Sequence, residues 1–333
     1  MLFRLMFLSG AVKLLSGDPN WRSLKALDYH YWTQPLPTPV GWYAAQLPAW
    51  LQRFSTGMVF AVELIIPFLI FTPRRLRHFA AMVMACFEFL IALTGNYAFF
   101  NLLTIALCIL LLEDSFFERR LPAQFIAPLR GGSERGATKT SVRAAATFAR
   151  VALAVVILTL SGAEMLRTFG RPGAVPAFVR AWTRRLAPYD LVNSYGLFAV
   201  MTTTRIEIVI EGSNDGQNWE TYEFKYKPGN VAQRPPWVAP HQPRLDWQMW
   251  FAALGDYQQN AWFPNLMVRL LQGSPDVTAL LATNPFPGGP PRFIRALSYD
   301  YHVTDLATRR ANGNWWQREL KGRYFPEVSL RGQ

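Results

Sequence analysis

Long apolar runs alternate with short polar or basic segments over the first half of the chain. A membrane-spanning helix needs about 20 mainly apolar residues, and several of these runs approach that length. The pattern therefore predicts a polytopic α-helical membrane domain of about five helices over residues 1–166. The five runs are residues 1–15, 54–72, 79–94, 98–112 and 144–163.

The second half of the chain has a different pattern. Residues 204–211 and 219–226 alternate between apolar and polar with period two, and turn-forming residues separate them. This is typical of a β-hairpin. We therefore predict an α+β domain with an antiparallel β-sheet over residues 167–333. It begins with a short amphipathic stretch at 174–186, and its other expected elements are helices at 245–254 and 260–271 and strands at 292–303 and 315–324.

Basic residues indicate how the helices are oriented. They gather at 73–78, and again in the cytoplasmic loop expected at 113–143. Cytoplasmic flanks of membrane helices are enriched in Lys and Arg. By alternation, the outer loop at 16–54 and the domain after about residue 165 lie outside the cytoplasm.

Composition agrees with a membrane protein, since 51% of the 333 residues are hydrophobic and 17% are charged. The net charge of +12 arises largely beside the apolar runs. No nucleic-acid reader motif accompanies it, so we expect no nucleic-acid partner.

Signatures of metal, cofactor or hydrolase chemistry are missing from the sequence. Cys86 and Cys108 lie inside apolar runs, which favours spectator thiols over a disulfide or zinc site. The turn at 213–216 lacks the full ligand set of a calcium loop, so a plain hairpin turn is favoured. There is no Gly-x-Ser-x-Gly elbow, phosphate loop or dinucleotide fingerprint. We therefore expect no metal and no cofactor.

The outer loop is polar, aromatic and rich in proline. Prolines at alternate positions predict an extended backbone over residues 34–39. Between two membrane helices, such a segment must lie outside the hydrocarbon or be buried against protein.

Two interpretations of the outer loop's ionisable residues stay open. In one, Asp18 caps a short helix that begins at Pro19, and the other polar groups tether the loop. In the other, Asp28, His30 and Lys13 form the start of an acid–base site.

Polar residues within or between the apolar runs form a second candidate group, namely Glu63, Glu88 and Asn96. Intramembrane carboxylates usually face the interior of a helix bundle and find partners there. With Lys13 and Arg4 as the available cations, a structural ion pair and a proton-handling site both stay open.

The third candidate group is the polar and aromatic segment at 241–250. Arg244 and Asp246 are expected either to pair locally while the tryptophans pack on the hairpin, or to join a polar cluster that meets the outer loop. Trp315 and Trp316 fit an interfacial aromatic belt or a client-binding surface.

Several motifs in fixed order resemble the lipase maturation factor family. In the first half they are Ser16-Gly17-Asp18-Pro19 with Trp21, Ala26-Leu27-Asp28-Tyr29-His30-Tyr31, Thr33-Gln34-Pro35-Leu36-Pro37-Thr38-Pro39 and Gly95-Asn96-Tyr97. In the second half they are Glu211-Gly212-Ser213, Tyr222-Glu223-Phe224, Lys227-Pro228-Gly229 and Ala239-Pro240-His241-Gln242-Pro243-Arg244-Leu245-Asp246-Trp247.

The resemblance implies a polytopic membrane protein with an extracytoplasmic C-terminal domain. It also implies a role in bringing secreted lipases to an active dimeric state, in the endoplasmic reticulum for eukaryotic relatives. The Arg-rich composition without a retention signal looks bacterial, which implies an inner-membrane protein with a periplasmic domain. Relatives carry further helices before the stretch at 3–7, so this chain is expected to lack those N-terminal helices.

These observations favour a membrane-anchored maturation or folding factor that contacts the bilayer and a secreted lipase or other exported client. The alternative is an integral-membrane enzyme that acts on a lipid or membrane-proximal substrate through Lys13, Asp28 and His30. The expected functional surface consists of Asp18, Trp21, Tyr29, Gln34, His241, Gln242, Arg244, Asp246 and Trp247.

Overall fold

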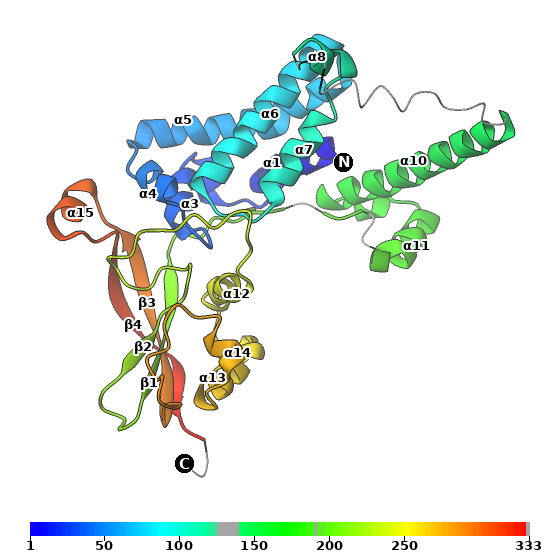
Figure 1. The fold of residues 1–333 in the computed structure, drawn as a ribbon. Helices are drawn as coiled ribbons and strands as arrows, with labels where there is room; N and C mark the ends of the chain where they lie inside the picture. Colours follow the sequence, from blue (N-terminus) through cyan, green and yellow to red (C-terminus); the bar gives the residue numbers. More distant parts are fainter. Residues whose placement is uncertain (121, 123, 125–139, 190–191, 195, 331–333) are drawn as a thin grey trace. The chain divides into compact units, whose positions relative to one another are not determined.

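The computed structural model of the chain describes residues 1–120, 122, 124, 140–189, 192–194 and 196–330 (Figure 1). The chain forms two compact units that do not follow a single cut in the sequence. The first unit contains Met1–Arg22, Gly57–Ala85 and Ile105–Val200, and the second contains Ser23–Thr56, Cys86–Thr104 and Met201–Gln333. Hydropathy predicts a boundary at residue 166, whereas the second unit combines part of the outer loop with the C-terminal domain.

The first unit is helical. Its helices, in part shared with the second unit, are α1 (Leu2–Leu15), α2 (Pro19–Arg22), α5 (Ala49–Phe60), α6 (Arg74–Thr94), α7 (Phe100–Ile109), α8 (Asp114–Glu118), α10 (Thr140–Thr168) and α11 (Ala177–Leu186). A π-helical turn (η1, Ala61–Ile65) and a 3₁₀ segment (η2, Ile66–Phe71) extend α5. Short 3₁₀ turns, η3 (Pro172–Ala174) and η4 (Ala187–Tyr189), flank α11.

Three helical segments of the described chain are long and apolar enough to cross a membrane. They are Ala49–Phe71, Arg74–Thr94 and Ala144–Thr168. The prediction of about five such helices is therefore confirmed for three of them. The 14 residues of α1 extend only about 21 Å at 1.5 Å per residue, and α7 has only 10 residues. Most of the predicted loop at 113–143 lies outside the described residues, and its described start contains α8.

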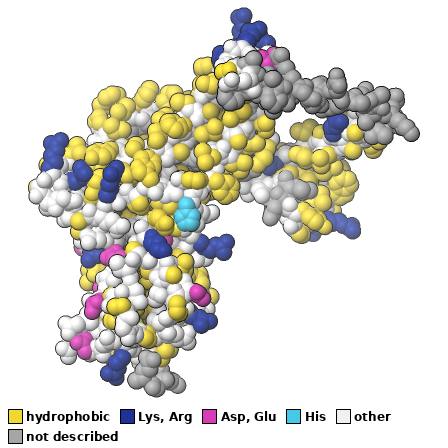
Figure 2. Space-filling model, viewed as in Figure 1, with side chains coloured by type: hydrophobic (Ala, Val, Ile, Leu, Met, Phe, Trp, Pro, Cys, Tyr) yellow, Lys and Arg dark blue, Asp and Glu magenta, His cyan; other side chains and the backbone are white. Residues whose placement is uncertain are grey.

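Figure 2 shows hydrophobic side chains over much of the visible surface of α5 and α6, and a mixture of polar and charged side chains over the β-sheet domain. Such an apolar exterior is what lipid contact requires of a spanning helix. The apolar surface and the length of these helices therefore both fit segments that span a membrane.

The second unit is built around a four-stranded antiparallel sheet of order β2-β1-β3-β4. Its strands are β1 (Ile206–Ser213), β2 (Glu220–Tyr222), β3 (Phe293–Val303) and β4 (Trp316–Val328). Ile210 lies opposite Tyr222 in the β1–β2 pair, which confirms the predicted hairpin. Both predicted C-terminal strands are confirmed as well.

Helices cover one face of this sheet (Figure 1). They are α12 (Arg244–Ala252), α13 (Trp262–Leu271) and α14 (Pro275–Thr278). A further helix, α15 (Leu306–Asn312), connects β3 to β4. A 3₁₀ turn, η5 (Tyr257–Gln259), separates α12 from α13. Alternate strand residues such as Ile208, Ile210 and Ile294 pack against Met249 and Phe263 in one buried core. The apolar face of the strands therefore packs against the apolar face of the helices, as the period-two and helical patterns predict.

The outer loop contributes two helices to the second unit. They are α3 (Ala26–Thr33) and α4 (Pro39–Ala44), and the proline-rich connection between them is not helical. Thr38 caps α4 by accepting the backbone N–H of Gly41 at 2.9 Å, and Pro39 occupies its first turn. Residues 34–38 are thus not helical, as expected: residues 34–36 bend, Pro37 forms an isolated β-bridge with Gly95 and Thr38 is extended. Pro39 already belongs to the helix.

Candidate functional site

The candidate site lies within the second unit, where the outer loop meets the β-sheet domain and the α6–α7 turn. We call residues 23–56 the loop segment. The prolines of this segment lack backbone N–H groups, so neighbouring carbonyls cannot all find partners in a regular ladder. The groups that satisfy these carbonyls show how the segment is held.

Arg205, directly before β1, holds the loop segment from the sheet side. Its Nη1 donates to the carbonyl oxygens of Trp32, at 2.8 Å, and Gln34, and its Nη2 donates to the carbonyl of Pro35 at 3.0 Å. The planar guanidinium offers several donors in a fixed fork. One fully buried side chain therefore replaces the donors that the proline-rich backbone lacks.

Two neighbouring charges accompany this guanidinium. Glu207 lies 2.7 Å from Arg205 Nη2 and 2.8 Å from Lys227 Nζ, and all three side chains are buried. Burial lowers the pKa of the Arg205 guanidinium, while the Glu207 carboxylate raises it. The sequence analysis missed Arg205 and Glu207, although their place on the alternating strand face was a usable signal.

Asn96 holds the loop segment from the α6–α7 turn. Its Nδ2 donates to the carbonyls of Leu36 at 3.1 Å and Pro236 at 3.0 Å. Its Oδ1 accepts the backbone N–H groups of Val238 at 2.8 Å and Ala239 at 3.0 Å. Both ends of the amide are thus engaged, and one side chain joins three segments that are far apart in sequence.

A second chain of hydrogen bonds runs beside Asn96. Gln34 Nε2 donates to the carbonyl of Thr94 at 2.7 Å, and its Oε1 accepts from the Tyr97 hydroxyl at 2.6 Å. The same hydroxyl lies 3.2 Å from His30 Nε2. Burial raises the pKa of Tyr97, so the phenol stays protonated as a donor. Gln34 and His30 therefore take part in joining α3 to the end of α6.

Aromatic packing completes this junction. Trp42 Nε1 donates to the carbonyl of Trp315 at 2.7 Å, and the two rings are 5.0 Å apart. The Arg309 guanidinium lies 3.8 Å from the Trp315 ring centre. The prediction that Trp315 and Trp316 are surface aromatics is wrong, because both are buried. Tyr29 packs partly buried against the same cluster.

The segment at 241–250 splits between support and surface. Asp246 accepts the backbone N–H groups of Tyr226 and Lys227, both at 2.9 Å, instead of pairing with Arg244. Burial raises the pKa of the Asp246 carboxyl against these hydrogen bonds. His241, Gln242 and Arg244 are exposed.

The tryptophans of α12 reach the loop segment and the α6–α7 turn. Trp250 Nε1 donates to the carbonyl of Thr33 at 2.8 Å, and the Trp247 ring meets that of Tyr97 at 6.4 Å. The expected contact between this segment and the outer loop is therefore made by the tryptophans, and not by the Arg244–Asp246 pair.

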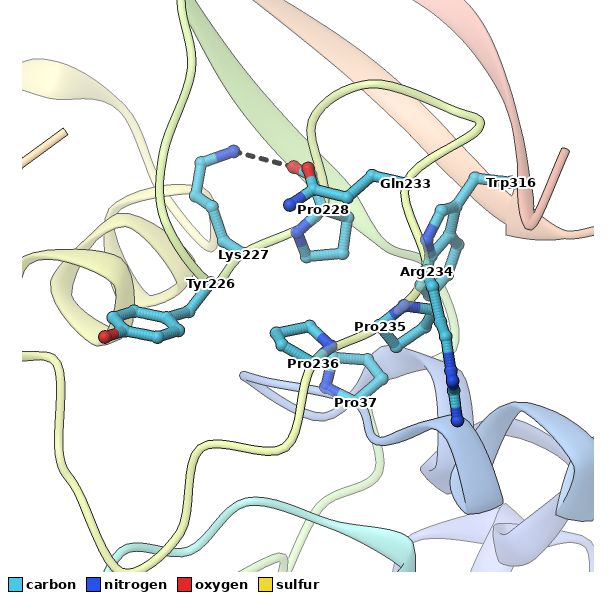
Figure 3. A pocket seen from close by; sticks show the side chains of 9 residues that line it. All are labelled: Pro37, Tyr226, Lys227, Pro228, Gln233, Arg234, Pro235, Pro236 and Trp316. Carbon is cyan, nitrogen blue, oxygen red and sulfur yellow. Dashed lines mark hydrogen bonds between the residues drawn. The ribbon is translucent and has the colours of Figure 1, made fainter. Parts of the chain in front are cut away.

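A small recess opens between the loop segment and the sheet domain (Figure 3). In it, Lys227 Nζ donates to the carbonyl of Pro228 at 3.0 Å, and the same ammonium reaches Glu207. Its charge is thus already engaged within the domain. The lining residues are Pro37, Tyr226, Lys227, Pro228, Gln233, Arg234, Pro235, Pro236 and Trp316.

Four further candidates, Asp18, Trp21, Lys13 and Glu63, belong to the first unit. Asp18 Oδ1 accepts the backbone N–H of Asn20 at 2.7 Å and that of Trp21 at 3.3 Å, which confirms the capping interpretation. Trp21 is buried and donates to the carbonyl of Phe198 at 2.8 Å. Lys13 Nζ lies 2.8 Å from both oxygens of Glu63.

The ion pair also bears on the acid–base interpretation. Lys13 is engaged by Glu63, whereas Asp28 and His30 lie on α3 in the second unit. Glu88 is buried, and its backbone carbonyl accepts from Asn101 Nδ2 at 3.2 Å. Asn96, grouped with the intramembrane residues by sequence, lies in the turn after α6. Among the described residues, no group of three or more His, Cys, Asp or Glu side chains is placed to hold a metal ion.

Comparisons with known proteins cover both halves of the chain. Residues 1–119 match the model of the lipase maturation factor transmembrane domain, and residues 191–326 match that of the lipase maturation factor C-terminal domain. Lipase maturation factor 2 of Xenopus laevis is 36% identical, and the match covers 99% of this chain and 60% of that protein.

Two further relatives give the same result. Human lipase maturation factor 2 is 36% identical, with 99% of this chain and 59% of that protein covered. Mouse lipase maturation factor 1 is 33% identical with the same coverage. The chain thus spans about 60% of the length of these relatives. No solved structure matches the chain.

Proposed function

Because the chain belongs to the lipase maturation factor family, we propose that it is a membrane-anchored factor that brings secreted lipases to their active form. The family models support this proposal in both halves, as do the three apolar helices of membrane-spanning length. Client, compartment and mode of action are part of the proposal.

One observation carries the mechanism. The loop segment, which lies between helices of the membrane half, is clamped to the sheet domain by Arg205 and to the α6–α7 turn by Asn96. The sheet domain is therefore fixed to the α6–α7 turn within the second unit. A rigid surface beside the membrane can hold a partly folded exported protein without a cofactor.

The client-binding surface follows from exposure. His241, Gln242 and Arg244 are exposed at the start of α12, and we assign client contact to them. Gln34 and Asp246 are buried, so their contribution is to position the surface, whereas Asp18 and Trp21 are buried within the first unit. Tyr29 and Trp247 are half-buried, so their exposure is intermediate between that of the two groups.

The compartment follows from the basic flanks. Arg74 and Arg77 lie in the first turn of α6, and both lie within 3.4 Å of Glu113. On this proposal the basic end of α6 faces the cytoplasm, where flanks of membrane helices are enriched in Lys and Arg. On this proposal the sheet domain lies outside the cytoplasm, in the periplasm if the source is bacterial. The bilayer and an exported lipase are then its two partners.

Co-expression tests the function directly. Each secreted lipase of the source organism would be expressed with the full chain, with the triple variant His241→Ala, Gln242→Ala, Arg244→Ala, and with no partner. The expected result is high lipase activity per mass of secreted lipase with the wild type, and a large loss with the triple variant at equal membrane abundance.

A matched control keeps the test specific. The control is a triple variant of three exposed residues of β4, namely Gln317→Ala, Glu319→Ala and Lys321→Ala. It should activate lipases normally. If no secreted lipase gains specific activity with the wild type, the proposed function is wrong. If both triple variants behave alike, the assignment of the client surface is wrong.

A further inference from the structure

Exposed aromatic side chains gather where the sheet domain meets the α6–α7 turn. We propose that Trp237, Trp247 and Phe251 form an interfacial anchor that seats the sheet domain on the headgroup region of the bilayer. The proposal concerns contact with lipid and does not depend on which client the protein serves.

Position follows from the turn that joins α6 to α7. The spanning helix α6 ends at Thr94, so the turn after it lies at the membrane boundary. Asn96 in this turn binds the carbonyl of Pro236 and the N–H of Val238. Trp237 lies between these two residues and is therefore held at the same boundary.

The helix α12 reaches the boundary through a second set of contacts. The Trp247 ring meets Tyr97 of the turn at 6.4 Å and Phe251 of its own helix at 6.4 Å. Phe251 also meets the Trp250 ring at 5.0 Å, and Trp250 is fixed by its hydrogen bond to Thr33. Trp237 and α12 are thus held beside the turn by independent contacts.

Exposure distinguishes Trp237 and Phe251 from a packed core, and Trp247 beside them is half-buried. Trp237 is 51% exposed and Phe251 is 56% exposed. Aromatic rings, tryptophan above all, favour the headgroup level of the bilayer. At that level one end of the side chain meets the apolar lipid tails and the other end meets water. Trp50, at the start of the spanning segment from Ala49, and Phe99, just before α7, are also strongly exposed. Exposed aromatic rings thus also mark the ends of the helices on this side.

Charge favours lipid as the occupant. Arg234 is exposed and lies three positions before Trp237 in the sequence. Cations beside interfacial rings attract anionic headgroups. Continuity with the spanning helices, together with this charge, favours a lipid surface over a protein partner.

The test measures how two positions of equal exposure meet the bilayer. In a chain with Cys86→Ser and Cys108→Ala, a nitroxide would be attached at Phe251→Cys or at Leu320→Cys on β4, where Leu320 is 54% exposed. The protein would be reconstituted in vesicles of phosphatidylcholine and phosphatidylglycerol. Power saturation then compares collisions with oxygen, which enters lipid, and with a charged nickel complex, which does not.

The expected result is a lipid-like oxygen preference at position 251 and a nickel preference at 320. Trp237→Cys repeats the test at an independent position, so one badly folded variant does not decide the outcome. Nickel access at 237 and 251 equal to that at 320 would overturn the proposal in favour of a solvent-facing surface. Protection of both positions from both reagents would also overturn it, in favour of a protein occupant.

Discussion

At the scale of single residues, the molecule depends on buried side chains that bind backbone rather than substrate. Arg205 satisfies carbonyls of the loop segment, and Asn96 binds both carbonyl and N–H groups of two segments. Asp246 and Asp18 likewise accept backbone N–H groups. Each replaces a regular hydrogen-bond ladder at a place where proline or a sharp turn prevents one.

The first prediction concerns Arg205. Arg205→Met keeps most of the side-chain volume but leaves carbonyls of the loop segment without a donor and Glu207 with one cation. Removing one partner of a buried pair costs about 3–5 kcal/mol, so the thermal midpoint of unfolding should fall steeply. Fluorescence-detected melting of the purified protein in detergent measures it.

Arg269→Met is the matched control, because Arg269 is an exposed arginine of α13. It should leave the midpoint nearly unchanged. A small effect of Arg205→Met, similar to that of the control, would mean that the loop segment is held by its aromatic contacts alone.

The second prediction concerns Asn96. Asn96→Asp keeps an acceptor for Val238 and Ala239 but turns the Nδ2 donors into an oxygen that faces the carbonyls of Leu36 and Pro236. These two carbonyl oxygens repel an ionised carboxylate. The hydrogen bonds that are no longer made cost about 1–3 kcal/mol or more. The folded-state pKa of the new Asp should therefore lie above its unfolded value. Its destabilisation should be present at neutral pH and disappear as the pH falls through that raised pKa.

Melting curves of Asn96→Asp and the wild type at several pH values give this difference. Asn96→Leu provides the comparison, since it loses the hydrogen bonds without gaining a titratable group. A deficit of Asn96→Asp that is independent of pH, like that of Asn96→Leu, would contradict the electrostatic explanation.

At the scale of elements, local sequence patterns predict the strands and helices well. The hairpin at 204–226 follows from period-two alternation around a turn, and α12, α13, β3 and β4 lie close to their predicted ranges. These elements bury one face, and that face is visible in the sequence itself. The site was predictable only in part, because many of its contacts join residues 60 or more positions apart.

Arg205 and Trp315 illustrate this limit. Arg205 precedes an ordinary alternating strand, and its carbonyl partners lie 170 or more positions earlier in the sequence. Trp315 has a polar neighbourhood in sequence, but the loop segment covers it through Trp42. In both cases the partner, and not the local pattern, determines burial. Family motifs did indicate the loop segment and the turn, which is why Gln34 and Asn96 were found.

The third prediction concerns the packing of α4 on the end of α6. A Cβ at Gly41 would lie 2.4 Å from the carbonyl oxygen of Thr94, closer than any relaxed contact. Gly41→Ala should therefore push the loop segment away and destabilise the fold by about 1–3 kcal/mol or more.

Gly57→Ala is the internal control, because a Cβ there meets nothing within 4 Å. Alanine also has the higher helix propensity, so this variant should be neutral or slightly more stable. Thermal midpoints of the two variants give the comparison. Equal stability of both would show that α4 can shift without cost.

The fourth prediction concerns the turn between β1 and β2. Asp215 Oδ1 accepts the backbone N–H groups of Gln217 and Asn218, both at 2.8 Å. These bonds lower the pKa of the exposed carboxyl below its usual value of 3.8. The folded-state pKa is depressed, so the stabilisation is present above pH 3.8 and is lost as the pH falls through the depressed value.

Asp215→Ala should therefore loosen the hairpin at neutral pH and remove its response to acid. Hydrogen exchange of the β2 amides, compared between the variant and the wild type, measures the opening. Ser213→Ala, which also bonds within this turn, should give a smaller effect. Unchanged β2 protection in Asp215→Ala would mean that strand pairing alone maintains the turn.

At the scale of the whole molecule, the second unit is assembled from three separate stretches of the chain. Hydropathy separates a membrane half from a water-exposed half, but the structural unit combines the outer loop and the α6–α7 turn with the C-terminal domain. The C-terminal domain alone lacks the carbonyls that Arg205 binds and the ring that covers Trp315.

The last prediction follows from this assembly. Residues 201–333 expressed alone should leave Arg205, Glu207 and Lys227 in contact with water at one end of the sheet, and the Trp315 ring without Trp42. Both the hydrophobic burial and the carbonyl partners of the buried cation would be lost. We expect this fragment to melt at a much lower temperature than the domain in the intact chain, or to aggregate.

Fusing residues 23–48 to its N-terminus through a flexible linker should restore a sharp melting transition, and the same fusion with Trp42→Ala should restore it only in part. A fragment that melts as sharply and as high without the loop segment would show that the clamp positions the domain without stabilising it, and Arg205→Met should then be tested for its effect on lipase activation rather than on folding.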